Sequence, residues 1–105
     1  MKDIKFSNAA WKFYLSLPEK VQMEFNAAIS TLESTGVLTM PSGRKLDENL
    51  YEIRVRVSPN QYRMIYCYIG RTDIHILTGF QKKTQKTPLS EINKAKKARK
   101  AVLNG

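Results

Sequence analysis

The sequence predicts an α+β domain in which helices pack on a mainly antiparallel sheet. Three strand-like runs follow one another with only short turns between them: 50–57, 61–69 and 73–80. This arrangement is typical of an antiparallel meander. Apolar residues at helical spacing precede the runs at 21–32 and follow them at 92–102. With 42% hydrophobic residues the chain supports one modest core, and we expect a single domain over 1–105.

The N-terminal part predicts a short edge strand and a first helix. Ile4 and Phe6 alternate with polar neighbours within the stretch 1–7, as in a strand at the edge of a sheet. A helix is then expected over 8–15. The sheet is therefore predicted to contain the three-strand meander and this N-terminal edge strand.

A second helix is expected to follow directly. Ser16 and Glu19 have the spacing of a capping box, and Pro18 falls in the first turn. Gly36 stops the helix. Its apolar stripe repeats at helical spacing and is interpreted as core: Val21, Phe25, Ala28, Ile29 and Leu32. The stretch 36–49 is expected to be a loop.

The strand-like runs differ in how they alternate. The first places its apolar residues on one face and its charged residues on the other: Tyr51, Ile53, Val55 and Val57 against Glu52, Arg54 and Arg56. In the second, three apolar residues share the parity of Arg63, namely Ile65, Cys67 and Ile69. We therefore expect both faces of its far half to be covered, while the Arg63 end stays open.

A last helix is expected from about Pro88 to Leu103, with Thr87 as the N-cap and Pro88 at the first helical position. Its apolar stripe consists of Ile92, Ala95 and Val102, and Arg99 falls within this stripe. Three interpretations of Arg99 remain open. The first is an ion pair with a carboxylate such as Glu52, and the second is a contact with a bound phosphate. The third is that the long side chain snorkels, so that its charged end reaches solvent.

Positive charge is concentrated at the C-terminal end. The formal net charge is +9, of which residues 1–80 carry +2 and residues 81–105 carry +7. The stretch "GFQKKTQKTP" (79–88) contains three lysines and no acidic residue. Such an asymmetry indicates a polyanionic partner, either nucleic acid or an acidic protein. A basic tail that only aids solubility is the alternative.

Several classes of protein are disfavoured. Cys67 and His75 are single residues of their kind, so neither a disulfide framework nor a metal cluster is expected, and we predict no metal and no cofactor. His75 is interpreted as structural, with a role as acid or base as the alternative. No apolar run approaches the ~18 residues of a membrane span, and no signal peptide is apparent. We expect a cytoplasmic protein without membrane association.

Four cations are expected to converge. Arg54 and Arg63 lie on neighbouring antiparallel strands, and the third strand leads to Lys82 and Lys83 just past its end. Because like charges repel, a fold that gathers them gains from a bound anion. We take these four as candidate catalytic residues. We expect further RNA contacts from residues around them: Lys45, Arg56, Phe80, Gln85, Lys86 and Arg99.

RNA phosphate suits this group of cations. Guanidinium grips a phosphate through two hydrogen bonds, and lysine supplies a movable charge. RNA also brings its own nucleophile, the 2′-OH, so a protein can promote cleavage by alignment, charge stabilisation and proton transfer. A lysine whose pKa is lowered by cationic neighbours can serve as acid or base. Tyr62 and Tyr66 offer stacking surfaces, although core packing is at least as well supported for them.

The motifs "LYEIR" (50–54), "QYR" (61–63) and "GFQKKTQKTP" followed by "EI" (79–92) together resemble the RelE/HigB toxin superfamily, in particular its phage-derived HigB-like branch. The resemblance covers about residues 15–103. It implies a small ribonuclease-like fold, with helices on one face of the sheet and an mRNA-cleaving site on the other. It also implies the toxin of a type II toxin-antitoxin system that cleaves mRNA on the ribosome, neutralised by a helix-turn-helix antitoxin.

Carried over to this chain, the resemblance makes Arg54 and Arg63 the sheet-face arginines and Lys82 and Lys83 the lysines beside the scissile phosphate. Relatives often have a His where this chain has Thr78, so a proton-transfer role for that His is lost here. Two alternatives remain open. One is a ParE-like inhibitor of DNA gyrase that binds without catalysis, and the other is a nucleic-acid-binding module without activity.

Overall fold

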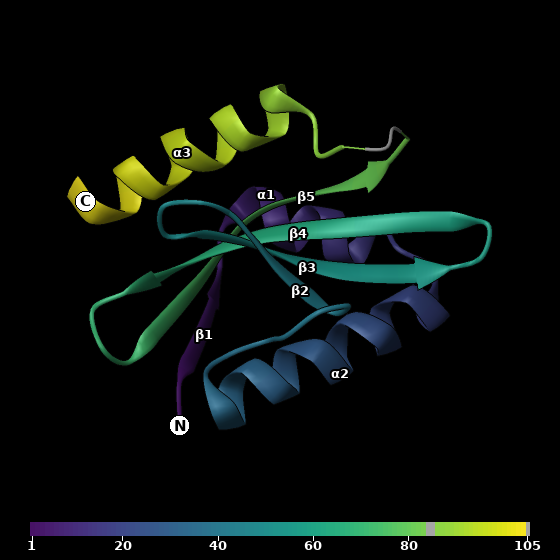
Figure 1. Ribbon diagram of the computed structural model, residues 1–105, viewed down its shortest axis with the longest axis horizontal. Helices are drawn as coiled ribbons and strands as arrows, with labels where there is room; N and C mark the ends of the chain where they lie inside the picture. Colours follow the sequence, from purple (N-terminus) through teal and green to yellow (C-terminus); the bar gives the residue numbers. More distant parts are fainter. Residues whose placement is uncertain (84–85, 105) are drawn as a thin grey trace.

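The computed structural model describes residues 1–83 and 86–104 and has one five-stranded sheet with helices on both faces (Figure 1). The elements in chain order are β1 (Asp3–Phe6), α1 (Asn8–Leu15), α2 (Glu19–Thr35), β2 (Gly43–Asp47), β3 (Leu50–Val57), β4 (Asn60–Ile69), β5 (Asp73–Lys82) and α3 (Leu89–Asn104). The strand order is β1-β5-β4-β3-β2. The predicted α+β class, with two N-terminal helices and a C-terminal one, is confirmed.

The predicted meander forms the centre of the sheet. β3, β4 and β5 pair antiparallel through short turns. The expected N-terminal strand is also present and pairs parallel with β5 at the edge. The expectation of a loop over 36–49 is wrong in part, because residues 43–47 form β2 and pair antiparallel with β3. This strand is short, and its sequence, "GRKLD", has no clear apolar alternation.

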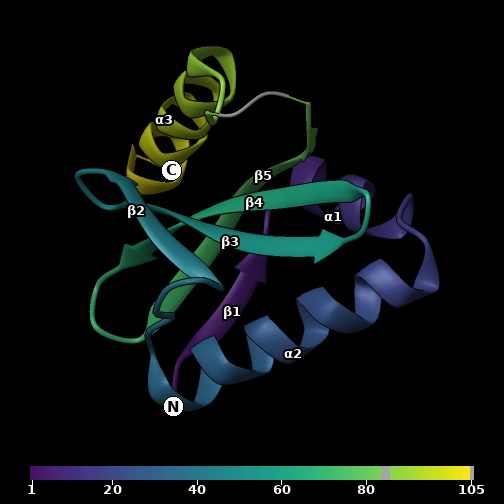
Figure 2. The same ribbon diagram turned by 45° about the vertical axis from the view of Figure 1, so that its right-hand side comes forward.

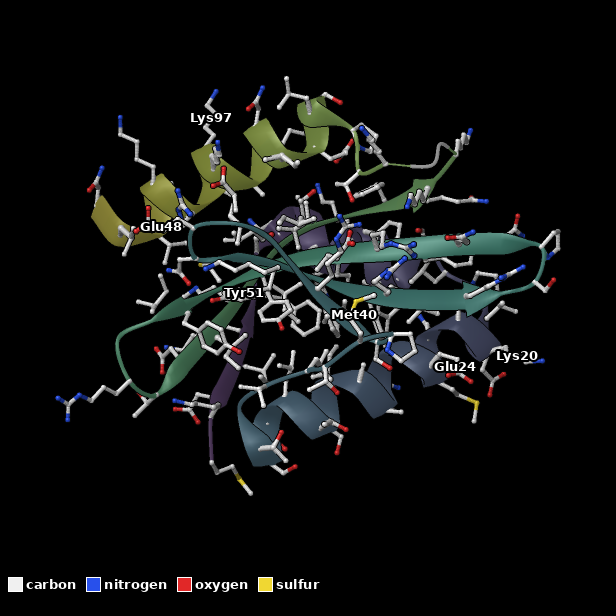
Figure 3. All side chains as sticks on the ribbon, viewed as in Figure 1. Lys20, Glu24, Met40, Glu48, Tyr51 and Lys97 are labelled. Carbon is white, nitrogen blue, oxygen red and sulfur yellow. The ribbon has the colours of Figure 1, made fainter. Side chains whose placement is uncertain are left out.

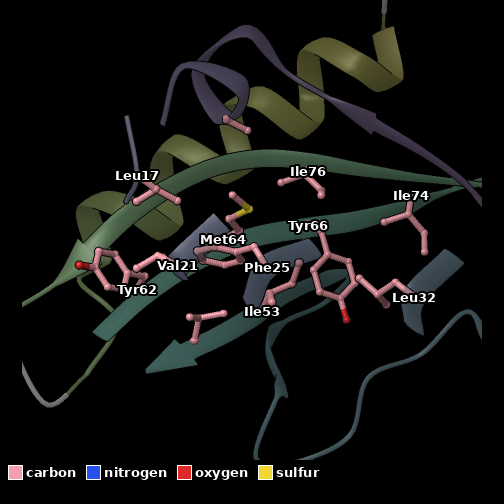
Figure 4. Packing of buried hydrophobic residues seen from close by; sticks show 12 residues of the cluster. Leu17, Val21, Phe25, Leu32, Ile53, Tyr62, Met64, Tyr66, Ile74 and Ile76 are labelled. Atoms are coloured by element: carbon pink, nitrogen blue, oxygen red, sulfur yellow. The ribbon is translucent and has the colours of Figure 1, made fainter. Parts of the chain in front are cut away.

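α1 and α2 cover one face of the sheet and bury the main core there. Figure 4 shows Phe25 and Leu32 of α2 against Ile53, Met64 and Tyr66 of the sheet. The stripe predicted for the second helix is therefore core, as expected. α2 ends at Gly36, whose φ of 83° is the left-handed conformation that favours glycine, and whose N–H bonds to the carbonyl oxygen of Leu32.

The start of α2 differs from the expectation. Pro18 stands at the N-cap and no side chain caps the helix. The hydroxyl of Ser16 instead donates to the carbonyl oxygen of Phe13, 2.6 Å away, at the end of α1. The predicted capping box is therefore wrong, because the two helices follow so closely that Ser16 closes the first one.

α3 packs on the opposite face of the sheet and covers only part of it (Figure 2). Ala95 is buried against a second cluster of apolar residues from the sheet: Leu50, Ile65, Cys67 and Leu77. The far half of β4 is thus covered on both faces, as predicted. The expected picture of helices on one face alone needs correction, because α3 shares a face with the arginines of β3 and β4.

The first turn of α3 also departs from the sequence expectation. The helix begins at Leu89, and the hydroxyl of Thr87 donates to Oε1 of Glu52, 2.8 Å away. The prediction that Thr87 caps the helix is wrong, because its side chain bonds to the sheet instead. Among the described helices, none is long and apolar enough to cross a membrane.

Candidate polyanion-binding site

The uncovered part of the α3 face is a groove of ≈ 870 Å³. It lies beyond the N-terminal end of α3, over the C-terminal ends of β3 and β5 and the N-terminal end of β4. Mostly basic and polar residues of these strands and the residues next to them line the groove: Arg54, Val55, Arg56, Pro59, Gln61, Arg63, Lys82 and Lys83. Pro41 and Ser42, from the segment before β2, complete the lining. Glu52, the acidic side chain near Arg54 and Arg63, is not part of this lining.

The register of the strands brings the predicted cations together. Arg54 lies directly opposite Arg63 in the β3–β4 pair, and Gln61 lies opposite Lys82 in the β4–β5 pair. Directly opposed residues of an antiparallel pair point to the same face. The structure therefore brings Arg54, Arg63 and Lys82 to one groove, and Lys83 follows at its edge.

Arg63 forms the floor of the groove. This end of β4 is left open as a groove, as expected, but the Arg63 side chain itself is only 2% exposed. Its Nη1 donates to the carbonyl oxygen of Tyr62 (3.0 Å) and its Nη2 to Oε1 of Gln61 (2.9 Å). Burial lowers the pKa of this guanidinium, and the nearby Glu52 carboxylate opposes that effect. The floor of the groove is thus a charged side chain that solvent hardly reaches.

Glu52 lies beside Arg54 and Arg63 on the same face of the sheet and is a site residue that the sequence reasoning missed. It is fully buried. Its carboxylate oxygens lie 3.6 Å from Nε of Arg63 and 3.8 Å from Nε of Arg54. The sequence suggested Glu52 only as an ion-pair partner of Arg99, as one of three alternatives. Its alternation with Arg54 was the available signal, but its partner Arg63 becomes apparent only once β3 and β4 pair.

Arg44, and not Lys45, lies on the face of the sheet that carries the groove. Arg44 is the cross-strand partner of Glu52, and its charge acts on Arg63 and Lys82. Lys45 is opposite Tyr51 and has its Nζ 6.0 Å from the centre of that ring. Tyr51 packs on the α2 side of the sheet. The expectation that Lys45 lines the RNA site is therefore wrong, since alternation along the unpredicted β2 sends it to the other face.

Lys82 is a predicted site lysine whose pKa is lowered by its surroundings. Burial lowers the pKa of its ammonium group, and the positive charges of Arg63, Arg54 and Arg44 lower it further. Glu52 acts in the opposite direction. The expected lowering by cationic neighbours is present, but desolvation is the larger cause.

The remaining candidates for RNA contact are distributed unevenly. Arg56 lines the groove. Phe80, opposite Arg63, is half-buried against the cluster under α3. Lys86 follows the groove residues in the chain and is exposed. Gln85 lies outside the described residues. Tyr62 and Tyr66 are buried in the main core, so they are core residues and not stacking surfaces.

Arg99 lies away from the groove. It extends from α3 to the turn between β2 and β3, where its Nη1 donates to the carbonyl oxygens of Glu48 (2.6 Å) and Asn49 (3.4 Å). Figure 3 shows Glu48 close to α3 at this turn. The ion pair with Glu52 is therefore wrong, and so is the placement of Arg99 at the rim of the site.

The two other reactive side chains are remote from the groove. Cys67 is buried under α3, and burial raises the pKa of its thiol to about 11. His75 is opposite Cys67 in the sheet and lies 3.9 Å from Asp73. Within residues 1–83 and 86–104, no three His, Cys, Asp or Glu side chains gather closely enough to hold a metal ion.

The fold and groove together define a small basic α+β domain with the architecture of RelE toxins. The intact E. coli RelBE toxin-antitoxin complex contains a chain with a TM-score of 0.64 and 16% identity, over 80% of this chain and 100% of that one. A mutant of E. coli toxin RelE in the free state has a TM-score of 0.66 and 21% identity, over 91% of this chain and 95% of that one. The isolated E. coli RelE toxin has a TM-score of 0.62 and 15% sequence identity, over 89% of this chain and 95% of that one.

The sequence itself assigns the family. Residues 12–100 match the family described as "Phage derived protein Gp49-like (DUF891)", and the chain belongs to it. A search of curated proteins found no match. The predicted relationship to phage-derived, RelE-like proteins is thus confirmed.

Proposed function

We propose that this protein is the toxin of a type II toxin-antitoxin system and that it cleaves mRNA in the groove. The observation that carries the proposal is the convergence of Arg54, Arg63, Lys82 and Lys83 on one groove. The RelE fold supports it, since RelE is described as a toxin and is found in a toxin-antitoxin complex. In this proposal the partners are mRNA on the ribosome and a helix-turn-helix antitoxin, all in the cytoplasm.

The proposed reaction is attack of the ribose 2′-OH on the adjacent phosphate. Negative charge grows on the phosphate oxygens in the transition state, and preorganised cations stabilise it most where water is excluded. Arg54, whose side chain is 24% exposed, and Lys83 hold the phosphate from the sides of the groove. Arg63 adds positive charge from the floor. These cations supply the charge that a metal ion provides in other nucleases, so the scheme needs no metal.

Lys82 is proposed to act in its protonated form. It stabilises the developing charge and gives its proton to the departing 5′-oxygen, while the attacking 2′-OH releases its proton to solvent water, so that a 2′,3′-cyclic phosphate and a free 5′-OH are formed. A general acid works best when its pKa lies near the working pH. The lowered pKa of Lys82 moves this ammonium group in that direction. Arg56 and Lys86 are proposed to hold the RNA backbone on either side, and Phe80 to contact a base.

Expression without antitoxin, followed by primer extension on a reporter mRNA, tests the proposal. The wild type is expected to halt growth and to produce new 5′ ends, and Arg63→Ala with Lys82→Ala is expected to abolish both. Loss of a charged contact in the groove is expected to cost roughly 1.5–3 kcal/mol for each of the two residues. Lys45→Ala with Lys97→Ala removes the same charge outside the groove and is expected to leave cleavage intact. Unchanged cleavage in the first pair would contradict the proposed site.

A supercoiling assay separates this function from a gyrase inhibitor. The purified protein is expected to leave DNA gyrase active at concentrations that cleave mRNA. Trapped gyrase–DNA complexes, without new mRNA ends, would establish the ParE-like alternative instead.

A further inference from the structure

The carboxylate of Glu52 occupies the centre of the cation group. It lies on the same face of the sheet as the two arginines, 3.6 Å from Nε of Arg63 and 3.8 Å from Nε of Arg54, and Glu52 is opposite Arg44 in the β2–β3 pair. Among the described charges that act on both Arg63 and Lys82, Glu52 is the acidic one. Without it, four cations would face one another in a partly desolvated place, and their mutual repulsion would force side chains apart.

Glu52 is held in place from a distant part of the chain. Oε1 accepts the hydrogen bond of Thr87, 35 residues away and two residues before α3. Thr87 therefore connects the start of α3 to the middle of the sheet. The hydroxyl holds the same carboxylate oxygen that lies 3.6 Å from Nε of Arg63.

The geometry is that of a supporting group and not of a catalytic residue. Glu52 is 0% exposed and does not line the groove, so its oxygens are not available to a bound RNA. Both distances to the arginines exceed hydrogen-bond length. Oε2 of Glu52 and Nε of Arg63 have no hydrogen-bond partner within the described residues. The carboxylate thus acts on both arginines through charge, and its position rests on Thr87.

We propose that Glu52, fixed by Thr87, is a positioning residue for the RNA cleavage proposed above: it is the internal counter-anion that orients Arg54 and Arg63 before substrate binds. The inference rests on that proposed function. It assigns to a buried acid a part in a site that otherwise consists of cations. It also explains why the segment before α3 is bonded to the sheet centre.

Glu52→Gln tests the role of the charge. The amide still accepts from Thr87 but no longer neutralises the arginines. We expect kcat on a short RNA to fall about 10-fold or more, as for other supporting residues of active sites. KM is expected to stay equal or to fall, since the groove becomes more positive. Glu33→Gln, on the exposed surface of α2, makes the same change in net charge and is expected to behave as wild type.

The pH profile gives a readout that a purely structural role would not change. The groups that face Lys82 are Arg63 of β4, Glu52 and Arg54 of β3, and Arg44 of β2. Glu52 raises the pKa of Lys82, whereas burial and the three arginines lower it. Removal of the carboxylate therefore lowers this pKa further, and the alkaline decline of kcat is expected to begin at lower pH.

Thr87 provides a second pair of variants in which the charge of Glu52 remains. Thr87→Val keeps the shape and removes the hydroxyl, and we expect a lower kcat with an alkaline limb near the wild-type position. Thr87→Ser restores the donor and is expected to restore kcat. If Glu52→Gln does not fold, this pair still decides the matter. A Thr87→Val variant that cleaves as fast as wild type would overturn the inference.

An NMR measurement separates this inference from the proposed function. The Nε–Hε resonance of Arg63 in the free protein is expected to shift in Glu52→Gln and Thr87→Val and to stay in place in Glu33→Gln. If the wild type cleaves no RNA, the proposed function fails, and the resonance still shows whether Glu52 orients Arg63. If the wild type cleaves RNA but Glu52→Gln matches its kcat, pH profile and Arg63 resonance, the positioning role is overturned.

Discussion

Arg44 and Glu52 lie directly opposite each other in the β2–β3 pair, so Arg44 points to the α3 face that carries the groove. The next residue, Lys45, points to the α2 face. Two adjacent basic residues of one exposed strand thus belong to different surfaces of the molecule. This arrangement allows a test in which charge, strand and exposure are nearly matched.

We expect Arg44→Ala to weaken RNA binding and Lys45→Ala to leave it almost unchanged. Each phosphate contact that is lost reduces the slope of log K against log salt by about 0.7 for a single strand. Fluorescence anisotropy with a short RNA at several salt concentrations measures both affinity and slope. Equal effects of the two variants would mean that the face on which a residue lies is irrelevant, and would contradict the proposed site.

The pH dependence of cleavage is expected to report Lys82. Since burial and neighbouring cations lower the pKa of its ammonium group, and since the protonated form is the active one, kcat is expected to decline with rising pH before an ordinary lysine would deprotonate. Lys82→Arg keeps the charge but is a poor proton donor. Its kcat is expected to be lower and free of this alkaline limb. An unchanged limb in Lys82→Arg would assign the titration to another group.

Gly79 allows α1 to approach the sheet. A Cβ added at this position would lie 2.1 Å from Cδ2 of Phe13. We expect Gly79→Ala to lower the free energy of unfolding by about 1–3 kcal/mol, as overpacking does. Urea unfolding of Gly79→Ala, Phe13→Ala and the double variant measures the coupling. The glycine change is expected to cost less when Phe13 is absent, and strict additivity would rule out the steric explanation.

Arg99 is expected to contribute to stability and not to cleavage. Arg99→Met removes its hydrogen bonds to the carbonyl oxygens of Glu48 and Asn49. This is expected to cost about 1.5 kcal/mol of unfolding free energy, the lower end for a charged donor, because the side chain is partly exposed. Lys97→Met, on the outer side of α3 (Figure 3), removes the same charge and is expected to cost under about 0.5 kcal/mol.

The two variants together decide between the sequence interpretation and the structural one. Thermal unfolding and primer extension are measured on both. A stable Arg99→Met that cleaves more slowly than Lys97→Met would restore the contact with RNA that the sequence suggested for Arg99.

The sequence determined by itself the features that depend on neighbours along the chain. Helical spacing indicated α2 and α3, alternation indicated the faces of β3, and Gly36 marked the end of a helix, because these signals arise from local backbone geometry. The short links between β3, β4 and β5 were enough to predict antiparallel pairing. That pairing in turn predicted the convergence of Arg54, Arg63 and Lys82, because residues opposite each other on paired strands share a face.

Only the tertiary structure decided which charges meet and which are buried. The pairing of β2 with β3 placed Arg44 on the face that carries the groove and Lys45 on the other face, and the sequence of β2 had little sign of a strand. The packing of α3 closed part of the sheet, and the tertiary structure buried Glu52 and Arg63 and joined Thr87 to a residue 35 positions away. Burial and contacts between distant segments depend on how whole elements pack, which no local pattern encodes.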